Sequence, residues 1–319
     1  MAEEFYDVVL QSTGCFIGNY EDWENYPPPQ DDFSLGTDFW IGRLPHNVES
    51  TTVLDACEPA GFHFHPIRQF GCRYAICRKV SPPSHGPEFY EWDHDGVMGR
   101  TLFLSRLIHP TTVATHYSAR LIFENDTLTT VVPGRVQGYG TQVWIVANEW
   151  RDWLSQTEAE QLRSYMPVYI LNAPERVRRA RSHIDHVFHA FYLDQRTASL
   201  VSSFESLLKV ERNRITEQFE LRVPALAQMV GLAITPDEAE VLYDDRSMYV
   251  HGRQPNYTDV SDEVMERYNR FETVLRRSLL RASTDTTFCD LFATDGEVVR
   301  AFGSLPTRRA VCAQRQLTP

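Results

Sequence analysis

The hydrophobic pattern of this chain changes at about Pro174, and this change constrains the fold more than any other feature. Before it, short segments rich in β-branched and aromatic residues alternate with turn clusters, a pattern typical of strands. After it, glycine and proline become sparse and apolar residues recur at the spacing of amphipathic helices. The chain length of 319 residues is sufficient for two domains. We therefore expect an α+β protein, with a mixed or β-rich domain over residues 1–173 and an all-α bundle over residues 174–319 that ends in a C-terminal extension after about residue 283.

In the first domain, the β-branched and aromatic segments predict strands over residues 5–10, 101–108, 116–123 and 142–146. A short helix should follow, with Ser155 or Thr157 as its N-cap and Glu158 in its first turn. Residues 1–170 contain no phosphate-binding loop, nucleophile elbow or dinucleotide fingerprint that we can identify. A sensor or regulatory role for this domain is a hypothesis from architecture alone.

In the second domain, an apolar stripe over residues 200–226 predicts one long amphipathic helix. Pro224 should kink or end this helix, because a proline inside a helix loses a hydrogen bond and clashes with the preceding turn. Residues 262–281 carry a second stripe and predict another helix. These stripes favour an all-helical bundle.

The helix expected over residues 236–251 has a clear start and end. Thr235 is a suitable N-cap, Pro236 fits the first helical position, and Glu238 completes a capping box. Gly252 follows directly, as is common where helices end.

The net charge of −12 is unevenly distributed. Residues 1–175 hold 11 basic and 23 acidic residues, whereas residues 176–319 hold 20 of each. The whole surface is therefore unsuited to nonspecific binding of nucleic acid. One basic run could contact phosphates, although a solvated helix face is the favoured interpretation; it consists of Arg176, Arg178, Arg179 and Arg181.

The first residues, 1–4, are acidic rather than basic, and no apolar run approaches the length of about 18 residues that indicates a membrane helix. We expect a soluble, cytoplasmic protein. The six cysteines show no repeated short spacing, which is typical of reduced thiols in that compartment.

Two groups of histidines have residue types that can bind a metal, but we expect neither a metal nor another cofactor. His63 and His65 lie near Cys57, Cys72 and Cys77, but the spacing does not match a common zinc finger. A second group, formed by His183, His186 and His189, could ligate a metal or line an RNA path. Steps of three residues turn each side chain away from the last, so packing against neighbouring apolar residues is favoured.

Arg246 interrupts the apolar stripe of the helix expected over residues 236–251. On a helical wheel it lies among Ala239, Leu242, Tyr243, Tyr249 and Val250. A guanidinium is costly to bury alone, so it must face a carboxylate, a polar cleft or a phosphate. Glu211, on the preceding stripe with Arg222, is the expected partner.

His251 lies about 140° from Arg246 on the wheel, on the side of Asp244 and Ser247. Its place at a helix C-terminus favours the imidazolium form. From spacing alone, a salt-bridged arginine and a histidine that caps the helix C-terminus are the favoured explanation of the pair.

Residues 242–252, with the sequence LYDDRSMYVHG, resemble the HEPN signature, in which four to six residues separate an arginine from a histidine. The match is to the Apea-like branch, and residues 204–208 and 215–222 resemble the long helix that precedes the motif there. The resemblance implies a bundle of four or five helices, usually dimeric, in which the arginine and histidine of two protomers line one cleft.

Many domains of this family are metal-independent endoribonucleases of defence or toxin systems, including anti-phage systems. By the resemblance, Arg246 and His251 are the catalytic pair and RNA is the substrate of a homodimer. Ser247 stands where many members place another polar residue. With it, Asp244, Glu211 and Arg222 are supporting candidates. The alternative is a noncatalytic module that binds nucleotides or RNA, or that dimerises.

Overall fold

The computed structural model describes residues 3–13, 32–57, 74–82, 96–109, 113–136, 154–190, 193–250 and 261–305. The chain divides into two compact units, unit 1 over Met1–Tyr169 and unit 2 over Ile170–Pro319. The division therefore falls slightly before the boundary expected at residues 173 and 174. The α+β class is confirmed, because unit 1 contains an antiparallel sheet and unit 2 is helical.

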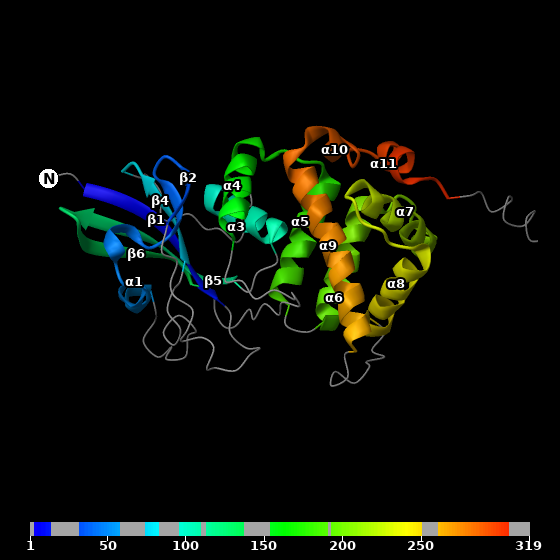
Figure 1. The fold of residues 1–319 in the computed structure, drawn as a ribbon, viewed down its shortest axis with the longest axis horizontal. Helices are drawn as coiled ribbons and strands as arrows, with labels where there is room; N and C mark the ends of the chain where they lie inside the picture. Colours follow the sequence, from blue (N-terminus) through cyan, green and yellow to red (C-terminus); the bar gives the residue numbers. More distant parts are fainter. Residues whose placement is uncertain are drawn as a thin grey trace, which may run out of the picture. The chain divides into compact units, whose positions relative to one another are not determined.

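The described part of unit 1 forms a six-stranded sheet with the order β2-β3-β4-β1-β5-β6. Every neighbouring pair is antiparallel. The central position of β1 in Figure 1 agrees with its two partners, β4 and β5. Expected strands at 5–10 and 116–123 are confirmed. The strands are β1 (Glu3–Thr13), β2 (Phe33–Gly36), β3 (Phe39–Gly42), β4 (Tyr74–Val80), β5 (Val113–Glu124) and β6 (Thr127–Val136).

Successive side chains of β1 point to opposite faces of the sheet, and both faces are buried there. Tyr6, Val8 and Leu10 belong to one core cluster with Leu54 of helix α1 (Ser50–Cys57), so α1 covers this face. The intervening Asp7 is also buried, where it forms an ion pair with the residue directly opposite on β5. Short helix η2 (Pro45–Asn47) precedes α1.

The prediction of a strand over residues 101–108 is wrong, because these residues belong to helix α3 (Val97–Ile108). Nearly every side chain of this segment is buried. A continuous apolar run has no alternation that could separate a buried strand from a buried helix. The following helix, α4 (Gln156–Tyr165), starts as expected, with Ser155 and Glu158 in a capping box; η3 (Met166–Val168) follows. The strand expected at 142–146 lies outside the described residues.

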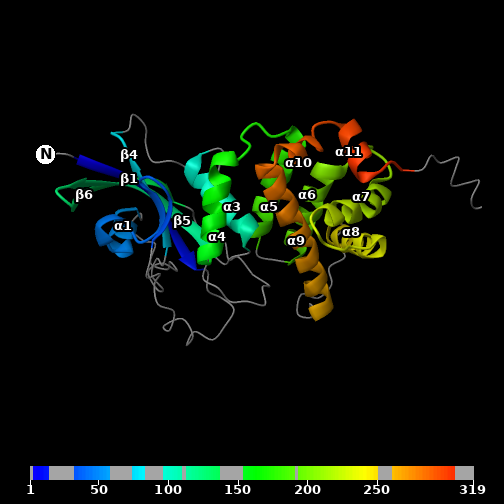
Figure 2. The same ribbon diagram turned by 45° about the horizontal axis from the view of Figure 1, so that its top comes forward.

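Helix α6 is the centre of unit 2 and packs against α5, α7, α8 and α9. Both ribbon views place it between α5 and α8 (Figures 1 and 2). The ring of Phe204 on α6 meets Phe219 and Phe271 edge to face, with centroid distances of 5.8 and 6.4 Å. The helices are α5 (Glu175–His189), α6 (Leu193–Leu208), α7 (Ile215–Met229), α8 (Pro236–Val250), α9 (Asp262–Thr284), α10 (Thr286–Asp290) and α11 (Asp295–Phe302).

The single helix expected over the stripe 200–226 is wrong, because α6 and α7 are separate. Arg214 caps α7 in the left-handed region at φ 59°. The Gln218 side chain holds the link between α6 and α7 in place. Its amide donates to the carbonyls of Glu211 and Asn213 and accepts from the N–H of Val210. The apolar stripe crosses the break because the link happens to preserve the spacing. Pro224 does not end α7.

The helices expected over residues 236–251 and 262–281 are present as α8 and α9. The capping box of α8 is confirmed: the N–H of Thr235 donates to Glu238 at 2.7 Å, and the N–H of Glu238 donates to the Thr235 hydroxyl at 3.2 Å. The last described residue of α8 is Val250, so the expected end at His251 and Gly252 lies outside the described residues. Among the helices that the structure describes, none combines the length and the apolarity that a bilayer span requires.

Candidate functional site

Arg246 is half-buried on the side of α8 that faces the bundle. Ala239 and Leu242, its expected neighbours on the wheel, are buried. Tyr243 is half-buried beside it. The side chains of Tyr249 and Val250, and the whole of His251, lie outside the described residues. Arg246 therefore lies within an apolar stripe, as predicted, as far as the described residues of α8 show.

Within the described part of the chain, the guanidinium of Arg246 has an aromatic neighbour and no acidic partner. Its Cζ lies 5.8 Å from the centre of the Tyr243 ring, within the range of a cation–π contact. Its Nε is buried and has no hydrogen-bond partner among the described residues. Two arginines of α9 differ in having acidic partners: Arg267 pairs with Asp245 at 3.1 Å, although its Nε also has no described hydrogen-bond partner, and Arg270 pairs with Glu238.

The expected ion pair between Glu211 and Arg246 is not formed within the described part of the chain. Glu211 is exposed in the link between α6 and α7, not on a helix, and its N–H donates to Gln218. Its carboxylate acts on the pKa of Arg222 instead, where it opposes the lowering caused by burial. The prediction failed because it assumed one continuous helix.

Tyr243 connects Arg246 to helix α6. Its hydroxyl donates to Oε1 of Glu205 at 3.2 Å, and its ring lies 5.3 Å from that of Phe219. Burial raises the pKa of Tyr243, and the Glu205 carboxylate raises it further, whereas Arg246 lowers it. Tyr243 therefore stays a neutral hydrogen-bond donor, held between a carboxylate and a guanidinium. Sequence spacing did not reveal Glu205, since it lies on another helix.

His183 lies on α5, which packs against α6. Its imidazole is half-buried, and its ring centre lies 6.5 Å from that of the exposed His186. Burial and the neighbouring His186 lower the pKa of His183, while the Glu205 carboxylate opposes them. Of this histidine series, His183 is half-buried and His186 is exposed, so the packing role predicted for the series is only partly met. The side chain of His189 lies outside the described residues.

Arg222 belongs to a different place in unit 2 and is fully buried. It donates to the carbonyls of Leu208 at 2.7 Å and Gly303 at 3.1 Å, and to the side chain of Gln218 at 2.9 Å. These acceptors lie at the end of α6, after α11 and on α7. Arg222 therefore joins three elements of the bundle, and its contacts do not include Arg246.

Asp244 is exposed on α8 and belongs to an acidic group with α7. Burial raises the pKa of Glu220, and repulsion from this group raises it further. Ser247, the other supporting candidate on α8, is half-buried. We name the carboxylates of this group the acidic edge; they are Glu217, Glu220, Asp237, Glu240 and Asp244.

The basic run of α5 is largely engaged within unit 2. Arg176 donates to the carbonyl of Lys209 at 2.6 Å and also pairs with Asp295, and the buried Arg181 donates to the carbonyl of Ile170. The two exposed members, Arg178 and Arg179, both pair with Glu175. The run is therefore not a free phosphate-binding face.

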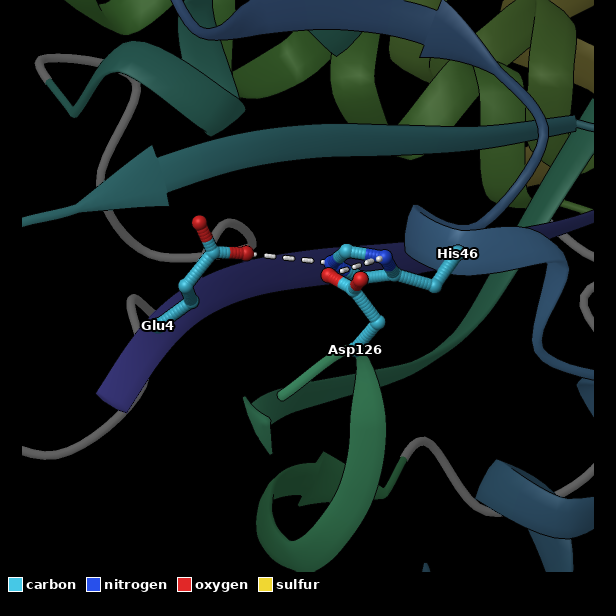
Figure 3. A group of neighbouring side chains, drawn as sticks. All are labelled: Glu4, His46 and Asp126. Atoms are coloured by element: carbon cyan, nitrogen blue, oxygen red, sulfur yellow. Dashed lines mark hydrogen bonds and ion pairs between the residues drawn. The ribbon is translucent and has the colours of Figure 1, made fainter. Parts of the chain in front are cut away.

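One group in unit 1 has the residue types of a metal site, namely Glu4, His46 and Asp126. Figure 3 shows the two carboxylates directed at different ring nitrogens of His46, at 3.0 and 3.4 Å. Lys79 also donates to Glu4, and Asp126 is largely exposed. Because the imidazole bridges two carboxylates and an ammonium already neutralises one, the contacts are those of an ion-pair network.

The other metal candidates are only partly visible. Cys57 and Cys77 are buried, and neither forms a disulfide with a described residue. His63, His65 and Cys72 lie outside the described residues.

Comparison of the chain with models of known protein families, with curated proteins and with solved structures gives no match.

Proposed function

We propose that this chain is a metal-independent endoribonuclease of the HEPN type that acts on cytoplasmic RNA, in a defence or stress response. The observation that carries the proposal is the state of Arg246. Its guanidinium lies within an apolar stripe, rests against Tyr243 and has no carboxylate partner among the described residues. A half-buried arginine that has no carboxylate partner is suited to bind an anionic group of the substrate.

The chemistry of arginine fits a phosphodiester. The guanidinium stays charged at any physiological pH and offers several N–H donors in one plane, so it can bind two non-bridging phosphate oxygens at once. The Tyr243 contact restricts the position of the head group before substrate arrives. Such preorganised charge stabilises the extra negative charge of a phosphoryl transition state.

His251 is the second catalytic residue of the proposal. It follows Arg246 by five positions in the motif, and a histidine can donate or accept a proton near neutral pH. Ser247 is the polar residue of the motif beside Arg246. The resemblance of residues 242–252 to the HEPN signature supports these assignments.

The proposed enzyme is a homodimer formed through unit 2. Val241 and Met248 expose 42% and 41% of their surface, and their separation of seven residues places both on one side of α8. Exposed apolar side chains on the motif helix support an interface there. Unit 1 is the proposed regulator or sensor.

The test uses the purified full-length protein and single-stranded RNA in the presence of a metal chelator. Arg246→Ala and His251→Ala should each lower the cleavage rate by at least about 100-fold, with helix content unchanged. Arg300→Ala is the matched control, because Arg300 is exposed on α11 and pairs only with its helix neighbour Glu297 in the described structure.

Two results would count against the proposal. Cleavage that survives both substitutions would show that another site, or a contaminant, cuts the RNA. RNA binding by the wild type without cleavage would favour the noncatalytic alternative.

A further inference from the structure

A carboxylate of helix α6 contacts the tyrosine that lies beside Arg246. Oε1 of Glu205 accepts a hydrogen bond from the Tyr243 hydroxyl at 3.2 Å, and the ring of Tyr243 lies 5.8 Å from Cζ of Arg246. All three side chains are half-buried, and α6 packs against α8 (Figures 1 and 2). The tyrosine therefore has a carboxylate at its hydroxyl and a guanidinium at its ring.

The partners of the two charged groups are not the strongest that they could have. A carboxylate and a guanidinium form charge-assisted hydrogen bonds, which are roughly twice as strong as bonds between neutral groups. Glu205 nevertheless bonds to a neutral hydroxyl, and Arg246 has no carboxylate partner among the described residues. Both side chains are long and contact the same tyrosine from neighbouring helices. The hydroxyl of Tyr243 thus engages a carboxylate that would otherwise compete for Arg246.

We propose that Tyr243 is a positioning residue whose hydroxyl holds the Glu205 carboxylate away from Arg246, so that the guanidinium stays free for a phosphate of RNA. The inference rests on the proposed function, because it concerns the availability of Arg246 for that substrate. Tyr243 acts through its two neighbours and touches no reacting atom. Its ring places the guanidinium, and its hydroxyl satisfies the carboxylate.

The ring of Tyr243 is held independently of its hydroxyl. Phe219 of α7 lies 5.3 Å from it, with an angle of 57° between the ring planes. Tyr243→Phe therefore keeps the aromatic contacts and removes the hydroxyl alone. Glu205 then lacks this hydrogen-bond donor in a half-buried place, where an unpaired carboxylate is costly. Arg246, the cation at the same ring, becomes its partner.

The test is the kinetics of RNA cleavage by the full chain with Tyr243→Phe, alone and combined with Glu205→Gln. In Tyr243→Phe a phosphate must displace the carboxylate before it binds Arg246. KM should therefore rise by about 10-fold or more, with kcat little changed. In the double variant no carboxylate competes, so KM should return to within about 3-fold of the wild-type value. Glu205→Gln alone should keep the wild-type KM, because an amide oxygen still accepts the tyrosine hydroxyl.

Tyr165→Phe is the matched control. The hydroxyl of Tyr165 also takes part in a hydrogen bond, which it accepts from the side-chain amide of Gln161 at 3.0 Å within α4. This change releases no carboxylate, so KM should stay at the wild-type value. Circular dichroism should show the same helix content in every variant.

Rescue by Glu205→Gln is a result that a purely structural role of the hydroxyl would not produce. If the hydroxyl only stabilised the packing of α8 on α6, removal of its partner as well would leave the defect in place. An impaired Tyr243→Phe variant that is not rescued would overturn the inference, and so would a Tyr243→Phe variant with the wild-type KM. In both cases the proposed function stands if Arg246→Ala is inactive.

A measurement without RNA separates the inference from the proposed function. If the wild type cleaves no RNA, the proposed function fails, and the NMR signal of the Arg246 Nε–H group decides the inference. This signal is assigned by its loss in Arg246→Lys. Pairing with a carboxylate should shift it in Tyr243→Phe, and addition of Glu205→Gln should return it to the wild-type position. A signal that Tyr243→Phe leaves unchanged would overturn the inference.

Discussion

Replacing Arg222 with alanine should strongly destabilise unit 2, although this residue lies outside the proposed active site. Arg222 is fully buried and donates three hydrogen bonds, to Leu208, Gly303 and Gln218. Its loss leaves two backbone carbonyls at helix ends without this donor, at a cost of about 1–3 kcal/mol each. Relief from burying a charge offsets part of the cost, because burial lowers the pKa of Arg222. We expect a net loss of about 3 kcal/mol in the free energy of unfolding.

The distribution of tryptophan allows this loss to be assigned to one unit. All six tryptophans precede Tyr169 and therefore lie in unit 1. In urea titrations, tryptophan fluorescence reports the unfolding of unit 1, whereas circular dichroism of helices is dominated by unit 2. Arg222→Ala should move the dichroism transition to lower urea and leave the fluorescence transition in place. The control Arg300→Ala should change either transition by less than about 0.5 kcal/mol.

Two results would refute the reasoning on Arg222. A dichroism transition that shifts by less than about 1 kcal/mol would show that water replaces its hydrogen bonds without cost. A selective loss of RNA cleavage, with stability unchanged, would return Arg222 to the supporting role expected from the sequence.

Three further predictions concern other parts of the chain. Combined Val241→Glu and Met248→Glu should convert the proposed dimer to monomers in light scattering, and an unchanged mass would place the interface elsewhere. Asp7→Asn breaks the buried ion pair between β1 and β5, so it should destabilise unit 1 by about 3–5 kcal/mol in the fluorescence transition; a shift below about 1 kcal/mol would contradict this. The hydrogen bond from Lys79 is the largest cause that lowers the pKa of Glu4 from 4.5 to about 2. Glu4 should therefore stabilise unit 1 above pH 4.5, and this contribution should vanish as the pH falls toward 2; Glu4→Gln should reduce the acid dependence, and an identical dependence would be inconsistent with the ion pair.

Local hydrogen bonding explains which parts of the fold could be predicted from the sequence. The capping box at Thr235 and the N-cap at Ser155, one of two candidates, were predicted because each needs only a hydroxyl and nearby helix residues. The errors at residues 101–108 and 200–226 arose where tertiary packing decided the structure. A fully buried helix has no polar face to reveal its period, and the side chain of Gln218 closes a link that the apolar stripe conceals.

The candidate site likewise contains residues that the sequence could reveal and residues that only the tertiary structure brings together. Arg246 could be found because a permanent charge stands out within an apolar stripe of one helix. Glu205, which accepts the hydrogen bond of Tyr243, could not be connected to it, because Glu205 lies on another helix and no spacing in the sequence relates the two. Glu211 was wrongly placed because its position depends on where α6 ends.

The central claim is that Arg246 binds the scissile phosphate, and the most direct measurement is the cleavage rate of Arg246→Lys in the presence of a metal chelator. Lysine keeps the positive charge but lacks the planar group that binds two oxygens. We predict that kcat/KM falls by about 100-fold while the unfolding transitions of both units stay in place. A folded Arg246→Lys variant that cleaves RNA at the wild-type rate would contradict the account.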